Sequence, residues 1–374
     1  MRRLTIIQSR GFFKAKIPNF EFTSVYLQVL RDFMTQANTS EDKILSTIKD
    51  LVALSGGTPD SFETELITQQ IQTSLRFLSE GHNIGQLKLI TRALKELRYA
   101  YRIFNDYPGS YRISIFGSAR TPEDHIDYLT AQQFSKEVAQ RGWMCITGAA
   151  NGIMKAGLAG LTPESSFGLS IRLPFEVPTN TYIEGDPKLI HFRYFFTRKL
   201  MFMSHSDAIT VFPGGFGTLD ELFEILTLMQ TGKTNIIPVV LLEGPKGYYW
   251  DHWEKYVKTN LLQNGWISPD DSHLFHIASS VQDGVEHIQQ FYKRYHSSRY
   301  VKEHLVIRMK SPITKEQLAS LNKKFVDLIK SGSMYLSEAL PEESNFKELP
   351  RIVFQHTRKD FGLVRALIDQ INEF

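Results

Sequence analysis

Apolar residues in the first part of the chain recur three or four positions apart, which is the spacing of α-helices. The segments SEDKILSTIKDLVAL at 40–54 and SFETELITQQIQTSLRFL at 61–78 both show it. Asp60 followed by Glu63 matches a capping box at the start of the second segment. A third helix is predicted to carry one apolar stripe, formed by Leu87, Ile90, Leu94, Leu97 and Tyr101. Residues 1–108 are therefore predicted to be a helical region. Its apolar stripes indicate helix packing, and its sequence carries no catalytic or binding motif.

The pattern changes after NDYPGS at 105–110 to short apolar runs separated by segments of helix length. These runs are YRISIFGSA at 111–119, GWMCITGAA at 142–150, SFGLSIRLP at 166–174, AITVFPGG at 208–215 and IIPVVLLEG at 236–244. Near-continuous apolar runs that alternate with helices predict a doubly wound parallel sheet covered on both faces, an α/β domain over residues 109–295. A further helix, the strand RIVFQ and a final helix predict a small α/β region at 296–374.

Composition narrows the class of protein. With 43 basic and 40 acidic residues the net charge is +3, too balanced to indicate a nucleic-acid partner. The sequence contains one cysteine, Cys145, in the apolar run GWMCITG. One cysteine cannot form an internal disulfide or a thiolate metal cluster. The sequence shows no signal peptide and no apolar stretch long enough to span a bilayer, so we expect a cytoplasmic protein without a membrane partner.

Three glycine loops follow predicted strands and carry the first chemical signal. VFPGGFGTLDE at 211–221 places Gly214, Gly215 and Gly217 before a helix. Its Thr218 and Glu221 match a capping box, which by itself marks an ordinary helix start. A capping box needs no bare loop before it, however, whereas an anion at a helix N-terminus needs exposed N–H groups and close backbone approach. We therefore interpret this loop as a phosphate site.

The other two loops are predicted to face the same ligand, because the carboxyl ends of parallel strands meet at one edge of the sheet. They are TGAANGIMKAG at 147–157, with Gly148 and Gly152, and FGSAR at 116–120, with Gly117 and Ser118. Neither matches the spacing of a dinucleotide fingerprint or of a nucleoside triphosphatase loop, which favours a ligand with one phosphate.

Charged residues near these loops have a structural and a chemical interpretation. Arg198 and Lys199 in FRYFFTRKLMF precede the strand that leads to the main glycine loop. A basic pair on a helix is usually a solvated face, but a guanidinium beside a carboxylate at a phosphate site forms a catalytic pair. The one grouping that suggests a metal site has no convincing further ligand, and we interpret it as structural or surface: Asp271, His273 and His276.

The segment PGGFGTLDE resembles the P-G-G-x-G-T-x-x-E signature of the Lonely Guy family. Arg198 stands fifteen positions before Pro213, as the arginine of that family's arginine-lysine pair does. The resemblance runs from about residue 111 to about residue 265. It implies a Rossmann-like fold, usually dimeric, that hydrolyses a nucleoside 5′-monophosphate to free base and ribose 5-phosphate without a metal or cofactor.

The resemblance also implies roles for individual residues. Arg198 and Glu221 match the catalytic pair, and Lys199, Thr227 and, more loosely, Glu176 match substrate-binding positions. The implied phosphate-binding residues are Gly214, Gly215, Gly217 and Thr218. The family's second loop commonly reads G-G-G-x-G-I-M-E, whereas residues 148–155 read GAANGIMK, with added methyl groups and a reversed charge.

Several alternatives stay open at this stage. The base is not selected, so the substrate is a purine or pyrimidine nucleotide, including the cytokinin type. A non-catalytic protein that binds a nucleotide or a phosphorylated cofactor, such as molybdenum cofactor, is the main alternative, and the altered second loop favours it. A decarboxylase would need pyridoxal phosphate on a lysine, and the site offers only Lys199, beside groups better suited to a phosphorylated sugar. The flanking regions are predicted to cover or gate the site or to extend a dimer.

Overall fold

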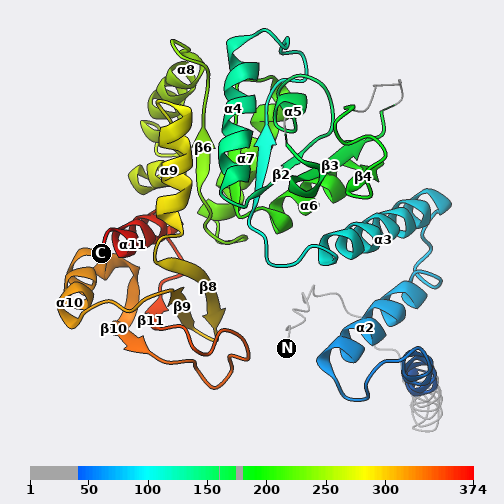
Figure 1. Cartoon of the computed structure of the whole chain (residues 1–374). Helices are drawn as coiled ribbons and strands as arrows, with labels where there is room; N and C mark the ends of the chain where they lie inside the picture. Colours follow the sequence, from blue (N-terminus) through cyan, green and yellow to red (C-terminus); the bar gives the residue numbers. More distant parts are fainter. Residues whose placement is uncertain (1–40, 160, 174–179) are drawn as a thin grey trace, which may run out of the picture. The chain divides into compact units, whose positions relative to one another are not determined.

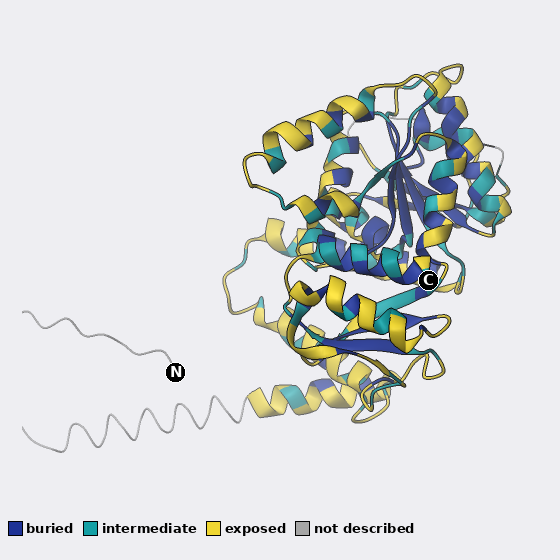
Figure 2. Cartoon of the chain, turned by 90° about the vertical axis from the view of Figure 1, so that its left-hand side faces the viewer, coloured by how far each residue is buried: buried dark blue, intermediate teal, exposed yellow. Residues whose placement is uncertain are grey.

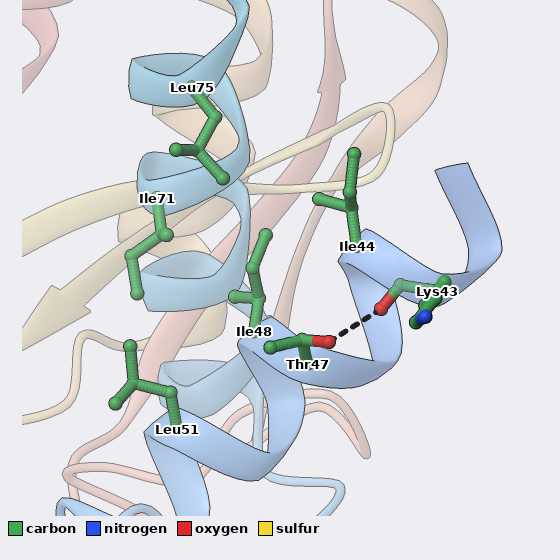
Figure 3. Close-up of a pocket in the computed structure, with 7 residues that line it drawn as sticks. All are labelled: Lys43, Ile44, Thr47, Ile48, Leu51, Ile71 and Leu75. Atoms are coloured by element: carbon green, nitrogen blue, oxygen red, sulfur yellow. Dashed lines mark hydrogen bonds between the residues drawn. The ribbon is translucent and has the colours of Figure 1, made fainter. Parts of the chain in front are cut away.

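The computed structural model describes residues 41–159, 161–173 and 180–374, and the chain divides into two compact units, Met1–Thr91 and Arg92–Phe374 (Figure 1). In the first unit a helix over 41–54 packs against α2 (Phe62–Arg76). A largely apolar cavity of about 410 Å³ lies between them, with Ile44, Ile48, Leu51, Ile71 and Leu75 among its lining residues (Figure 3).

The predicted cap of α2 was wrong by one residue. Ser61 is the N-cap, and its hydroxyl accepts a hydrogen bond from the N–H of Thr64 at 3.2 Å. Asp60 has a φ of 60° and lies outside the helix, so the Asp60 and Glu63 spacing does not form the capping box.

The predicted apolar stripe of α3 (Ile84–Asn105) was also wrong, because the buried face is a different one. Leu94 and Tyr101 are exposed. The helix face that packs inside the second unit has small residues near its middle. At its end Phe104 stacks on Phe167, with 4.7 Å between ring centroids. The buried residues of α3 are Ala93, Glu96, Ala100, Ile103 and Phe104.

A seven-stranded sheet with all pairs parallel forms the centre of the second unit (Figure 1). In spatial order its strands are β4 (Leu189–Phe192), β3 (Ser166–Ile171), β2 (Met144–Thr147), β1 (Arg112–Phe116), β5 (Ala208–Val211), β6 (Val239–Leu241) and β7 (His276–Ile277). The five predicted runs form β1, β2, β3, β5 and β6, and the predicted doubly wound α/β fold is confirmed. Sequence analysis missed β4 and β7, which are the two edge strands.

Helices cover both faces of this sheet, and its strands are almost entirely buried (Figure 2). On one face lie α4 (Ile126–Gln140), α5 (Ile153–Ala156) and α9 (Val281–Phe291); α6 (Phe195–His205) and α7 (Phe216–Gln230) lie on the other. Cys145 is buried in β2, and burial raises the pKa of its thiol to about 12. It is a core residue.

The order of the strands fixes where a ligand can bind. From β1 the chain continues to β2 on one side, and from β5 it continues to β6 on the other, although β1 and β5 are neighbours. This reversal opens a crevice beyond the carboxyl ends of β1 and β5, the usual ligand position in such sheets. Gly117 and Gly214 follow these two strand ends.

The C-terminal part is an antiparallel sheet ordered β10 (Ile329–Ser337), β11 (Arg351–His356), β9 (His304–Met309), β8 (Tyr295–Val301), with helices α10 (Lys315–Lys324) and α11 (Phe361–Glu373). Asn372 of α11 donates from Nδ2 to the carbonyl of Phe291 on α9 at 2.6 Å. The predicted strand at 351–355 and both predicted helices are present, while the division at residues 108 and 295 stays a prediction. None of the described helices is long and apolar enough to cross a membrane.

Candidate active site

The three predicted glycine loops meet in the structure. The N–H of Ser118 donates to the carbonyl of Pro213 at 3.1 Å, and the N–H of Ile153 donates to the carbonyl of Ser118 at 3.0 Å. Gly152 has a φ of 63°, and a Cβ there would lie 2.2 Å from the carbonyl oxygen of Ser118. The loop after β1 is thus held between the loops after β5 and β2, with Gly117 against Ile153.

Two glycines of the main loop serve different purposes. A Cβ at Gly214 would lie 2.2 Å from Oγ1 of Thr218 and 3.0 Å from the nitrogen of Ser118, so only glycine fits there. At Gly215, and at Gly217 beside it, a Cβ would meet nothing within 4 Å. Packing therefore accounts for Gly214, whereas Gly215 borders open space at the start of α7.

The capping-box interpretation of Thr218 and Glu221 is contradicted. Helix α7 begins at Phe216, its N-cap is Gly215, and no side chain caps it. Thr218 and Glu221 lie inside the helix and are 7% and 5% exposed. The first N–H groups of an α-helix lack internal partners and carry partial positive charge, so this bare helix start is suited to an anion.

Lys199 joins α6 to an acidic face of α7. Its Nζ lies 2.8 Å from Asp220, 2.6 Å from Glu224 and 3.5 Å from Glu221. Burial lowers the pKa of Lys199, but hydrogen bonds from its ammonium to Asp220 and Glu224 outweigh this and leave the pKa raised. Lys199 and Thr227 line one cavity of about 410 Å³, together with Asp220, Phe223, Glu224 and Leu228.

Arg198 is directed from α6 toward the second glycine loop. A Cβ at Gly148 would lie 3.8 Å from its Nη1, and the guanidinium carbon lies 5.2 Å from the ring centroid of Phe195. Its Nε is buried without a hydrogen-bond partner among the described residues. Burial lowers the pKa of Arg198, and the charge of Glu221 opposes that shift.

Glu221 is a buried carboxylate under the influence of two cations, Lys199 and Arg198. One of its oxygens, Oε2, has no hydrogen-bond partner in the described part of the chain. Burial raises the pKa of Glu221, while the charges of Lys199 and Arg198 lower it by less. A desolvated acid whose pKa responds to a nearby guanidinium, itself carrying an N–H without a partner in the described part of the chain, is an arrangement typical of catalytic sites.

These shifts predict a pH dependence for any activity that needs ionised Glu221. Because its pKa is raised, the carboxylate forms at higher pH than in exposed glutamate, and activity rises with pH through that value. Lys199→Gln removes the nearest positive charge, so the acid limb of the kcat–pH profile should move to still higher pH. Lys233→Gln, at an exposed lysine beyond α7, is the matched control. An acid limb that stays in place in the Lys199 variant contradicts this prediction.

Neighbouring residues accommodate the positions at which the second loop differs from the family signature. Ala149 takes a left-handed φ of 57°, and its buried methyl group faces Gly168 of β3, where a Cβ would lie only 3.1 Å away. Lys155 pairs with Glu123 at 2.5 Å. The predicted substrate residue Glu176 lies outside the described residues.

The grouping of Asp271, His273 and His276 has other partners. Asp271 forms a capping box with Ser268 and accepts a hydrogen bond from Gln230, while His276 pairs with Asp283 at 2.9 Å. The described residues contain no cluster of three or more histidine, cysteine, aspartate or glutamate side chains arranged for a metal ion.

Sequence analysis missed Tyr249, the first residue of α8 (Tyr249–Tyr256). Its hydroxyl donates to the carbonyl of Gly214 at 2.7 Å. Glu243 in turn accepts the N–H groups of Tyr249 and Trp250 at 3.0 and 3.1 Å. A tyrosine after a turn has no periodic signature, so nothing in its spacing indicates this support of the glycine loop.

Tyr249→Phe removes this one hydrogen bond and keeps the ring. Because the loop carbonyl then loses its donor, we expect KM for the nucleotide to rise roughly two- to tenfold, with little change in thermal stability. The neighbouring Tyr248 is 66% exposed, and Tyr248→Phe is the matched control. Equal KM values for the two variants in steady-state kinetics would show that the hydrogen bond does not shape the loop.

The two glycines give a second prediction. Gly214→Ala should lower stability by about 1–3 kcal/mol, because its methyl group overlaps Thr218. Gly215→Ala should fold with wild-type stability, yet raise KM about tenfold or more by filling the space assigned to the phosphate. Thermal melts and nucleotide titrations of both variants check this, and an unchanged KM for Gly215→Ala contradicts the phosphate assignment.

Known proteins resemble the central part of this chain in sequence. The sequence profile of the family described as "Possible lysine decarboxylase" matches residues 137–288. A cytokinin riboside 5′-monophosphate phosphoribohydrolase of Mycobacterium tuberculosis is 25% identical over 184 residues, 48% of this chain and 94% of the relative. Over this central part the chain is similar to proteins of the Lonely Guy family.

Other Lonely Guy relatives match over a shorter stretch. A cytokinin riboside 5′-monophosphate phosphoribohydrolase of Arabidopsis thaliana is 36% identical over 98 residues, 26% of this chain; this chain spans only 44% of that relative's length. Among solved structures, a molybdenum cofactor carrier protein from Chlamydomonas reinhardtii is 19% identical, with a TM-score of 0.35 over 49% of this chain and 98% of the other.

Proposed function

We propose that this protein hydrolyses the N-glycosidic bond of a nucleoside 5′-monophosphate, releasing the free base and ribose 5-phosphate. One observation carries the proposal: the half-buried Arg198 and the buried Glu221, each close enough for its charge to shift the pKa of the other, accompany a bare helix N-terminus at the topological switch point of the sheet. The names of the similar Mycobacterium and Arabidopsis proteins support this reaction class.

The glycine loop would bind the 5′-phosphate. Gly215 and Gly217 leave room for phosphate oxygens, and the first N–H groups of α7 with the hydroxyl of Thr218 would donate to them. The dipole of α7 stabilises the negative charge of the phosphate at its N-terminus. This attraction offsets the repulsion expected from the acidic residues around Lys199. The phosphate thereby orients the ribose toward Glu221.

Glu221 and Arg198 would act on the glycosidic bond. As the bond from C1′ to the base nitrogen breaks, positive charge develops on the ribose and electrons move to the base. The Glu221 carboxylate stabilises this positive charge and accepts a proton from the water whose oxygen attacks C1′. The Arg198 guanidinium, whose Nε has no partner among the described residues, stabilises the negative charge on the leaving base. The base then takes up a proton from solvent, and Glu221 returns the proton it accepted to solvent.

The finer points are part of the same proposal. Purine and pyrimidine nucleotides both fit the reaction, and the cytokinin-type nucleotides of the relatives' names are one candidate class. We also propose that the chain works as a homodimer, the usual assembly of Lonely Guy proteins, in the cytoplasm.

A panel of nucleoside 5′-monophosphates incubated with the pure protein tests the proposal, with chromatography of free base and ribose 5-phosphate. We expect release from at least one nucleotide and none from the matching nucleoside, which lacks the phosphate. Calorimetric titration of the same panel covers the alternative, since tight binding without release identifies a non-catalytic nucleotide-binding protein and overturns the proposal.

A further inference from the structure

A buried carboxylate outside the catalytic pair is bonded to the start of α6. Glu96 lies on α3, and its side chain is 4% exposed. It accepts the N–H of Arg193 at 3.0 Å and the hydroxyl of Thr197 at 2.8 Å. Thr197 directly precedes Arg198, so these bonds hold the segment that carries the candidate catalytic arginine.

Helix α6 has no side-chain cap of its own. Its N-cap residue, Tyr194, makes no such hydrogen bond. The N-terminus of a helix presents N–H donors without internal partners and a partial positive charge. Glu96 supplies the complementary negative charge from a different helix, and it bonds on either side of the N-cap, to the N–H of Arg193 and to the hydroxyl of Thr197.

The remaining contact of Glu96 does not account for its burial. Nε of Arg92 lies 3.2 Å from the carboxylate, but this side chain is 43% exposed and sits on α3 itself. An ion pair within one exposed helix face needs no buried carboxylate. The buried carboxylate of Glu96 instead has its partners at the start of α6, Arg193 and Thr197.

We propose that Glu96 is a positioning residue that fixes the first turn of α6 and so the direction in which Arg198 meets Glu221. This rests on the proposed function. The phosphate loop belongs to β5 and α7, and Lys199 of α6 is held separately by Asp220 and Glu224 of α7. The proposal therefore separates two kinetic constants. Loss of Glu96 lowers kcat, while KM for the nucleotide stays close to the wild-type value.

The test compares Glu96→Gln, Thr197→Val and the double variant with Lys95→Gln, which alters the exposed neighbour on the same helix. We expect Glu96→Gln to lower kcat at least about tenfold with KM within about twofold. The double variant should lose less than the product of the two single losses, because both remove the same bond. Thr197→Val replaces the hydroxyl by a methyl group of similar size, which also removes its contact with the carbonyl of Tyr194. This variant tests the proposal if Glu96→Gln fails to fold.

Hydrogen–deuterium exchange keeps this proposal separate from the proposed function. If the wild type releases base, a kcat for Glu96→Gln within twofold of wild type overturns the proposal. If the wild type releases no base, the proposed function fails, and exchange decides about Glu96. Faster exchange confined to residues 193–199 then supports the positioning role, and unchanged exchange there contradicts it.

Discussion

Glu221→Gln is expected to lower kcat for base release by about 10²- to 10⁴-fold, the range for loss of a general base. The amide keeps the size of the side chain but neither accepts a proton from water nor carries the charge that stabilises the ribose cation. Among the described residues Oε2 of Glu221 accepts no hydrogen bond and lies 3.5 Å from Nζ of Lys199, so the amide of equal size breaks no hydrogen bond at that atom and the fold is expected to stay intact. Single-turnover assays with the preferred nucleotide measure the effect.

Glu224→Gln is the matched control for this variant. Glu224 lies three positions further along α7 and also contacts Lys199, at 2.6 Å, but it is more exposed than Glu221. We expect its kcat to fall far less. Similar losses in both variants would assign the effect to the charge around Lys199 and remove Glu221 from its catalytic role.

Arg198→Ala is expected to lower kcat by about 10²- to 10³-fold with KM nearly unchanged, because the guanidinium acts on charge that develops only in the transition state. Arg198→Lys should recover little of this loss. The ammonium lacks the planar fork, and burial that already lowers the pKa of Arg198 penalises a lysine more. Steady-state kinetics across a nucleotide concentration series separate kcat from KM.

Arg98→Ala, at an exposed position on α3, controls for the loss of one positive charge and should match the wild type. A rise in KM with an unchanged kcat for Arg198→Ala would contradict the assigned role. Arg198 would then anchor the phosphate, and the leaving base would need another group to stabilise it.

The sequence predicted the parts of the site that depend on strand order. Apolar runs ending in glycine loops indicated β1, β2 and β5, and parallel strand ends share one edge, so the loops after these three strands were expected at the same edge, where the structure has them. The edge strands were missed for a physical reason. β4 contains the exposed His191, and β7 is only two residues long, so neither forms a continuous apolar run.

The contacts that position the site were beyond prediction. Glu96 and Thr197 are 101 positions apart, and a glutamate on an amphipathic helix normally faces solvent. The apolar stripe predicted for α3 included Leu94 and Tyr101, which are exposed, and so pointed away from the face that holds Glu96. Tyr249 likewise acts through one hydrogen bond to a loop 35 positions earlier. Contacts of this kind depend on tertiary packing, which spacing does not encode.

The most direct test of the central claim is the reaction of the preferred nucleotide in water labelled with oxygen-18, analysed by mass spectrometry. The account predicts equal amounts of free base and ribose 5-phosphate, one labelled oxygen in the sugar product, and loss of both products in Glu221→Gln. Base release that leaves the sugar unlabelled, or that persists in Glu221→Gln at the wild-type rate, would contradict hydrolysis by this site.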